Sequence, residues 1–252
     1  MTPEDFSVFA KYKDAPANAF GSKNNPLSIV TEADKHSYII IHDTLKEIAE
    51  SAINTPARAS SLKLKSMNFS KQYGSRGHRP VDIWMSVCGQ ESDAFGKMPQ
   101  IYLIASERGL EIGFAVSIDE ADYHDPNVKA RNRDIVPQIN LKLPHPASQL
   151  ANTLSARISS SEYHWHFNSK ARLIDSSAGY DQWNSFQEML NDLRGSGRPQ
   201  GGGSIATTIN ISNISTSVVR HAFGEAVNLF EALVLGCQPN SIEQSVIEIE
   251  DS

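Results

Sequence analysis

Residues 71–119 decide the fold, and they read KQYGSRGHRPVDIWMSVCGQESDAFGKMPQIYLIASERGLEIGFAVSID. Three runs in this stretch have the composition of β-strands, and they are Val81–Val87, Gln100–Ala105 and Leu110–Ile118. The second and third runs are joined by Ser106–Gly109, a short segment that ends in the glycine favoured by hairpin turns. The stretch therefore predicts an antiparallel meander.

The third run alternates in side-chain character with the period of two that a strand requires. One parity is apolar, and the other holds Glu111, Gly113, Ala115 and Ser117. We expect the apolar side to face a core and Glu111 to face the other way. The small residues on that second side leave room for a neighbour, either nucleic acid or, as we prefer, a helix. The apolar residues are Leu110, Ile112, Phe114, Val116 and Ile118.

Apolar residues at three- and four-residue spacing predict helices in the sequence before and after the meander. No strand–helix–strand alternation accompanies them, so the predicted class is α+β, an antiparallel sheet with a central meander packed with several helices. The predicted helices are a short one that begins near Thr2 and longer ones at 31–51, 147–157, 179–194 and 215–235. The additional predicted strands are an edge strand within 58–71 and strands at 162–167 and 205–214.

The length of 252 residues, 40% of them hydrophobic, is enough for a sizeable core, and we expect one α+β domain over 1–252. Residues 195–204 are rich in glycine and predict a flexible segment, and 240–252 predict an acidic tail. The sequence shows neither a signal peptide nor a membrane span, so we expect a cytoplasmic protein with no membrane partner.

A basic segment stands out in a chain of net charge −6. Between Glu50 and Asp82 it has six cations and no acid, and a loop of Gly74, Ser75 and Gly77 lets backbone amides approach a phosphate. The alternative is an edge strand whose lysines discourage pairing with another chain. The cations are Arg58, Lys63, Lys65, Lys71, Arg76 and Arg79, and all but Arg58 join the loop residues as predicted nucleic-acid contacts.

The sequence lacks the motifs that several kinds of enzyme chemistry require. It has no GxxxxGK[ST] loop for nucleotide hydrolysis, no GxSxG nucleophile motif and no acid–x–lysine nuclease pattern on a predicted strand. We therefore predict no catalytic residue and no cofactor. His164 and His166 project from one side of a predicted strand, but nothing selects a third ligand, so no metal site is predicted.

Three aromatic residues are candidates for stacking on a base, and they are Trp84, Tyr102 and Trp165. Packing in the core is the alternative for each of them. Trp165 has the opposite strand parity to His164 and His166, so one of these two faces is expected to be exposed.

The meander also resembles a known family. The loop Tyr73–Gly77 enters a strand with a tryptophan, Val81–Trp84, and the run Pro99–Ile104 pairs with Gly109–Ala115. Over residues 60–145 this resembles the N-terminal domain of McrB-type, modification-dependent restriction proteins, in which a DNA-recognition domain precedes a GTPase motor. The resemblance implies DNA binding and the sensing of a modified base.

The first functional hypothesis is a DNA-binding module of a restriction or defence system without a motor of its own. Its partners would be DNA, modified or not, and a separate motor or nuclease subunit. Two alternatives stay open. One is a metal-dependent nuclease whose site escapes sequence inspection, and the other is a protein-interaction module.

Overall fold

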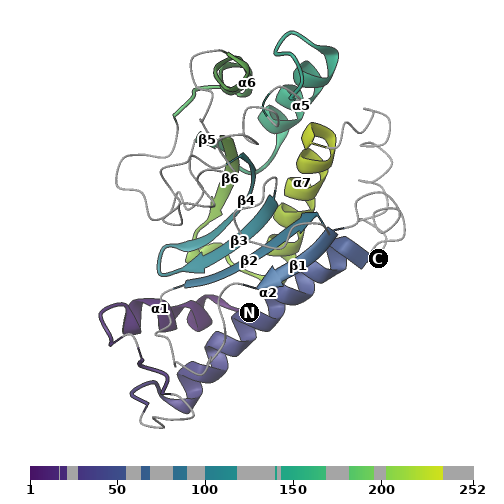
Figure 1. Cartoon of the computed structure of the whole chain (residues 1–252). Helices are drawn as coiled ribbons and strands as arrows, with labels where there is room; N and C mark the ends of the chain where they lie inside the picture. The colour runs from purple at the N-terminus through teal and green to yellow at the C-terminus, as the bar shows by residue number, and fades with distance from the viewer. Residues whose placement is uncertain are drawn as a thin grey trace, which may run out of the picture. The chain divides into compact units, whose positions relative to one another are not determined.

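The computed structural model describes residues 1–16, 18–21, 28–54, 64–68, 82–89, 100–117, 140, 143–168, 182–195 and 203–234. Its helices and strands alternate irregularly along the chain (Figure 1). The helices are η1 (Pro3–Phe6), α1 (Ser7–Tyr12), α2 (Glu32–Asn54), α5 (Gln149–Ser160), α6 (Phe186–Arg194), η4 (Ile211–Asn213) and α7 (Thr216–Val234). The strands are β1 (Leu64–Asn68), β2 (Asp82–Gly89), β3 (Gln100–Ser106), β4 (Gly109–Ser117), β5 (His166–Asn168) and β6 (Gly203–Ile209).

The described strands form one six-stranded sheet in the order β1-β2-β3-β4-β6-β5. The first four strands are neighbours in the order of the sequence. Of these, β2, β3 and β4 are the predicted meander, and β1 lies at an edge as expected. β5 pairs with β6 in the antiparallel sense, with Phe167 opposite Ile205. The predicted α+β fold with an antiparallel sheet is confirmed.

Two glycines of β4 explain why β6 can lie against it. Gly109 has a φ of +123°, and a Cβ there would come within 2.4 Å of the carbonyl oxygen of Ile209. A Cβ at Gly113 would come within 2.5 Å of the carbonyl oxygen of Ile205. Residue numbers rise along β4 while those of its neighbours in β6 fall, so these two strands are antiparallel.

Both faces of β4 are buried. Phe114 is fully buried, and its ring meets that of Phe230 on α7 at a centroid distance of 6.1 Å, as a core-facing position requires. Glu111, on the side where a helix or nucleic acid was expected as the neighbour, is fully buried as well and accepts a hydrogen bond of 2.9 Å from the Tyr102 hydroxyl. The alternation therefore predicted the core side, but the second side is an interior too.

The chain divides into two compact units, and β2, β3, β4, β6 and α7 each contribute to both. The first unit comprises residues 1–87, 102–112 and 208–223, and the second comprises 88–101, 113–207 and 224–252. The prediction of one domain over the whole chain stays a prediction.

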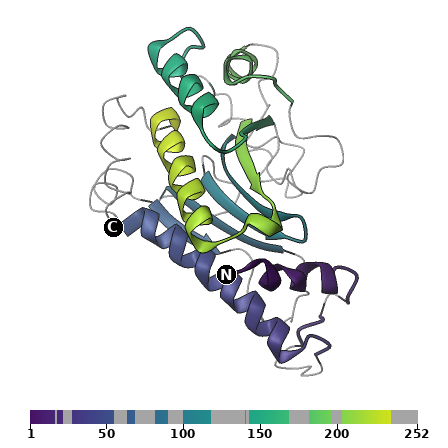
Figure 2. The same ribbon diagram turned by 180° about the vertical axis from the view of Figure 1, so that it is seen from behind.

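In the first unit, α1 and α2 lie side by side, as two opposite views show (Figures 1 and 2). Phe9 and Phe20 meet Tyr38 of α2 edge to face, at centroid distances of 6.1 and 5.2 Å. Asp34 ties the two helices together, because its carboxylate accepts hydrogen bonds from Lys11 and Tyr12. Burial acts to raise the pKa of Asp34, but the hydrogen bonds from Lys11, Thr31 and Tyr12 outweigh it and hold this pKa below its ordinary value.

Several predicted boundaries after residue 160 are wrong. The helix expected over 179–194 begins only at Phe186, and the strand expected over 162–167 is reduced to His166–Asn168. Of the flexible segment expected at 195–204, Gly203 and Ser204 belong to β6, and 196–202 lie outside the described residues. The strand expected over 205–214 stops at Ile209 and is followed by η4.

None of the helices in the described part of the chain combines the length and the apolar character needed to cross a lipid bilayer.

Candidate functional site

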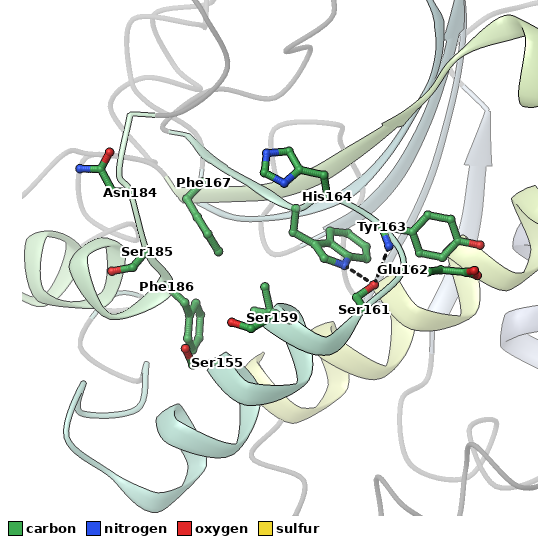
Figure 3. A pocket seen from close by; sticks show the side chains of 12 residues that line it. Ser155, Ser159, Ser161, Glu162, Tyr163, His164, Phe167, Asn184, Ser185 and Phe186 are labelled. Carbon is green, nitrogen blue, oxygen red and sulfur yellow. Dashed lines mark hydrogen bonds between the residues drawn. The ribbon is translucent and has the colours of Figure 1, made fainter.

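A pocket of about 490 Å³ opens in the second unit (Figure 3). It lies between the C-terminal half of α5, the segment that leads into β5, and the start of α6. The pocket is lined by Ser155, Ile158, Ser159, Ser161, Glu162, Tyr163, His164, Trp165, Phe167, Asn184, Ser185 and Phe186. Its volume falls within the range of small-molecule sites.

Aromatic side chains form the floor of this pocket. Trp165, Phe167 and Phe186 are only 4%, 7% and 2% exposed, so they are anchored in the core and present small parts of their rings to the opening. The rings of Phe167 and Phe186 are 6.3 Å apart and tilted by 39°. A bridge between Phe167 and Trp183 brings the segment before α6 beside β5, which carries Phe186 into place.

The start of α6 follows from its capping residues. The Ser185 hydroxyl accepts a hydrogen bond of 3.1 Å from the Glu188 amide, and the Glu188 carboxylate accepts one of 2.9 Å from the Asn184 amide. These bonds satisfy amides that the first turn leaves without a helical partner. Trp183 is fixed by its indole nitrogen, which donates to Asp192 at 3.0 Å.

Ser161 stabilises the side of the pocket opposite the start of α6. Its hydroxyl oxygen accepts hydrogen bonds from the Trp165 indole nitrogen at 3.1 Å and from the Tyr163 amide at 3.0 Å. The same hydroxyl donates to the Glu225 carboxylate of α7 at 2.6 Å. One donor and two acceptor positions are therefore in use, which is the full capacity of a serine hydroxyl. Ser161 thus fixes the orientation of the Trp165 indole.

The charges around the pocket are mostly acidic. Burial raises the pKa of Tyr163, and its hydrogen bond with Glu162 and the charge of Glu225 raise it further, so the phenol stays neutral. Burial lowers the pKa of Arg157 on α5, and the nearby Glu225 carboxylate opposes that shift. Among the described residues that line the pocket there is no lysine or arginine.

His164 and His166 lie together at this site. Their rings are 4.5 Å apart between centroids and nearly perpendicular, and the His164 side chain is exposed. The expectation that one of the two faces is exposed is confirmed, because Trp165 is buried whereas His164 is exposed. The residues that the structure describes contain no group of three metal-ligating side chains.

The serines give the pocket its hydrogen-bonding capacity. Ser155 and Ser159 lie one turn apart on α5, and the Ser155 hydroxyl donates to Gln187 at 3.0 Å, which leaves its oxygen able to accept. Ser159 is exposed at the opening. The arrangement suits a small uncharged group that touches the exposed parts of the aromatic rings and hydrogen-bonds with the serines.

The structure places the predicted site residues in different settings. Of the basic segment, only Lys65 falls in a described element, β1, and its side chain lies outside what is described. Trp84 is half-buried in β2, whereas Tyr102 is fully buried, so its ring offers no face to a base in this structure. Trp165 lines the pocket. Lys63, Lys71, Gly74, Ser75, Arg76, Gly77 and Arg79 all lie outside the described residues.

Most of the pocket was missed by sequence reasoning. Its α6 side was hidden because the helix was expected to begin at residue 179. The pattern Ser185-x-x-Glu188 is a capping signal and would have placed the start correctly. The serines of α5 gave no signal, because exposed serines are common on helices.

Comparison with known proteins gives no match, either to a protein-family model or to a curated protein.

Proposed function

We propose that this chain is a DNA-binding module of a restriction or defence system, and that its pocket receives one base turned out of the DNA. The observation that carries the proposal is the pocket of about 490 Å³, which has an aromatic floor of Trp165, Phe167 and Phe186 and serine hydroxyls along its side.

A nucleobase matches this chemistry. Bases that leave the duplex are held by stacking on aromatic or apolar side chains and by hydrogen bonds to their edges. The small exposed parts of Trp165, Phe167 and Phe186 would contact the base, and Ser155 and Ser159 would hydrogen-bond to its edge. The absence of lysine and arginine from the described lining favours a neutral group over a phosphate inside the pocket.

The phosphate backbone would be held elsewhere, by the basic segment. Its six cations without an acid are the electrostatic pattern of a backbone contact, and the glycine-containing loop would admit a phosphate to its amides. Backbone contacts position a duplex without reading its sequence, so the pocket would supply the selectivity.

The resemblance to McrB-type proteins supports a base that carries a modification. Residues 60–145 hold the motifs behind that resemblance, and a phosphate-binding loop for a motor is missing from the sequence. Any motor or nuclease would then be supplied from outside residues 1–252, and the module would act in the cytoplasm.

The test uses a DNA duplex with one 2-aminopurine opposite a mismatched base, where unpairing is least costly. Fluorescence of 2-aminopurine rises when the base leaves the stack, and an extruded base should produce that rise on binding. Ser159→Tyr should abolish the rise because it fills the opening. Ser160→Tyr is the matched control, since Ser160 is exposed on the same helix but does not line the pocket.

Two results would overturn the proposal. Saturable binding without any change in 2-aminopurine fluorescence would show that the base stays in the duplex. An equal response from Ser159→Tyr and Ser160→Tyr would show that the base goes to another place.

A further inference from the structure

We infer that the modification sensed by this module is a sugar, linked to the base that the pocket receives, and that the serines of α5 hydrogen-bond to its hydroxyls. This inference rests on the proposed function and names the chemical class of the modified base.

The pocket is larger than a bare base requires. Its volume of about 490 Å³ falls in the range of sites that enclose drug-sized ligands. A nucleobase is smaller than such ligands, and a methyl group adds little to it, whereas a hexose is comparable in size to the base itself. The volume therefore suits a base with a bulky substituent better than a base alone.

Serine hydroxyls on α5 give the pocket both kinds of hydrogen-bonding group. Ser155 donates its hydrogen to Gln187 at 3.0 Å, so its oxygen can only accept a bond from a ligand. Ser159 lies one turn further along α5, is exposed at the opening, and carries a hydroxyl that can donate as well as accept. Each sugar hydroxyl also donates and accepts, so it matches this pair, whereas a methyl group matches neither serine.

The exposed ring areas fit the remaining surface of a sugar. Trp165, Phe167 and Phe186 present small apolar areas to the same pocket as the serines (Figure 3). A sugar ring carries C–H groups beside its hydroxyls, so it needs apolar contacts of limited area next to hydrogen-bonding groups. Ligand sites commonly combine an apolar lining with a few polar groups in this way.

The charges around the pocket favour a neutral substituent that donates hydrogen bonds. Glu162 belongs to the lining and is exposed, and an ionised carboxylate only accepts hydrogen bonds. Glu225 lies outside the lining but accepts a hydrogen bond from Ser161 at 2.6 Å. The described lining has no lysine or arginine to pair with an anion. Sugar hydroxyls can donate to carboxylates, whereas an anionic substituent would be repelled by them.

The experiment compares the affinity for mismatched duplexes that differ only at the target base, which is 5-methylcytosine, 5-hydroxymethylcytosine or glucosylated 5-hydroxymethylcytosine. The last two bases differ only in the sugar. Two added hydrogen bonds of ordinary strength correspond to binding about tenfold tighter, so the glucosylated duplex should be preferred by about that factor. Methyl glucoside, added alone, shows whether the pocket binds a sugar apart from DNA.

Ser159→Ala should remove part of this preference. It deletes a hydroxyl at the opening and should lower the preference for the glucosylated duplex about threefold. Ser160→Ala is the matched control, because Ser160 is exposed on the same helix but lies outside the lining. Urea unfolding of both variants checks that a difference in binding does not come from misfolding.

The outcomes separate the two proposals. Equal affinity for the hydroxymethylated and glucosylated duplexes would show that the sugar is not bound, even if 2-aminopurine still reports an extruded base. An equal preference in Ser159→Ala and Ser160→Ala would place the sugar outside this pocket. Binding of methyl glucoside without a preference for the glucosylated duplex would mean that the pocket serves a free carbohydrate, and the inference would again be wrong. If 2-aminopurine never responds, the proposed function itself fails.

Discussion

The hydroxyl of Ser161 donates to the Glu225 carboxylate at 2.6 Å, and this bond ties one wall of the pocket to α7. Ser161 also receives the indole N–H of Trp165, so Glu225 acts on the pocket from a position outside its lining. The Glu225 carboxylate on α7 thereby helps to set the orientation of the Trp165 ring through the Ser161 hydroxyl.

Replacing Glu225 by alanine should loosen this wall. The Ser161 hydroxyl loses its acceptor in a half-buried setting, which should cost about 1–2 kcal/mol of the free energy of unfolding. Glu225→Gln keeps an oxygen acceptor and should cost less than half as much. Urea unfolding measures both variants, and equal losses would show that the charge of Glu225, rather than its hydrogen bond, matters.

Phe114→Ala should destabilise the protein by about 3–5 kcal/mol, because it removes a fully buried ring that packs on Phe230. Urea or thermal unfolding provides the measurement. Stability equal to wild type would mean that the register of β4, and with it the hairpin, is misassigned.

Glu111→Ala should cost about 1–3 kcal/mol, since it leaves the buried Tyr102 hydroxyl without this acceptor. From the sequence alone, with Glu111 on the side away from the core, the expected change was within about half a kcal/mol. A double-mutant cycle with Tyr102→Phe measures the pairwise term. Additive losses from the two single variants would argue against the Tyr102–Glu111 bond.

Asp34 should make the first unit sensitive to acid. Its pKa is held below the ordinary value of 3.8, so its stabilising effect is complete above that value and is lost as the pH falls through the lowered pKa. Asp34→Asn should cost about 1 kcal/mol at pH 7 and progressively less below pH 4. Unfolding curves at pH 7, 4 and 3 measure this difference, and a pH-independent one would contradict the assignment.

The sequence predicted the parts of the fold that have a strong local period. The hairpin, α2, α5 and α7 were expected close to where they are, because their apolar residues recur at strand or helix spacing over many positions. Glu111 shows the limit of this reasoning. Alternation tells which residues share a face, but whether the second face is covered depends on helices distant in sequence.

The pocket could be predicted less well for a related reason. Trp165 was a candidate for base stacking, but its position depends on the hydrogen bond between Ser161 and Glu225. These two residues are 64 positions apart, so no local sequence pattern predicts the bond. Tyr102 was a candidate of the same kind and is buried. An aromatic residue on a strand gives the same sequence pattern whether it lines a pocket or packs in the core.

The most direct test of the proposed function is the indole N–H resonance of Trp165 during titration with the mismatched duplex. The sequence has three tryptophans, so the spectrum should hold three indole signals, and Trp165→Phe identifies the relevant one. A base stacked in the pocket should shift the Trp165 signal in proportion to saturation, while that of Trp84, on β2, moves little. Saturable DNA binding with an unmoved Trp165 signal would contradict the account.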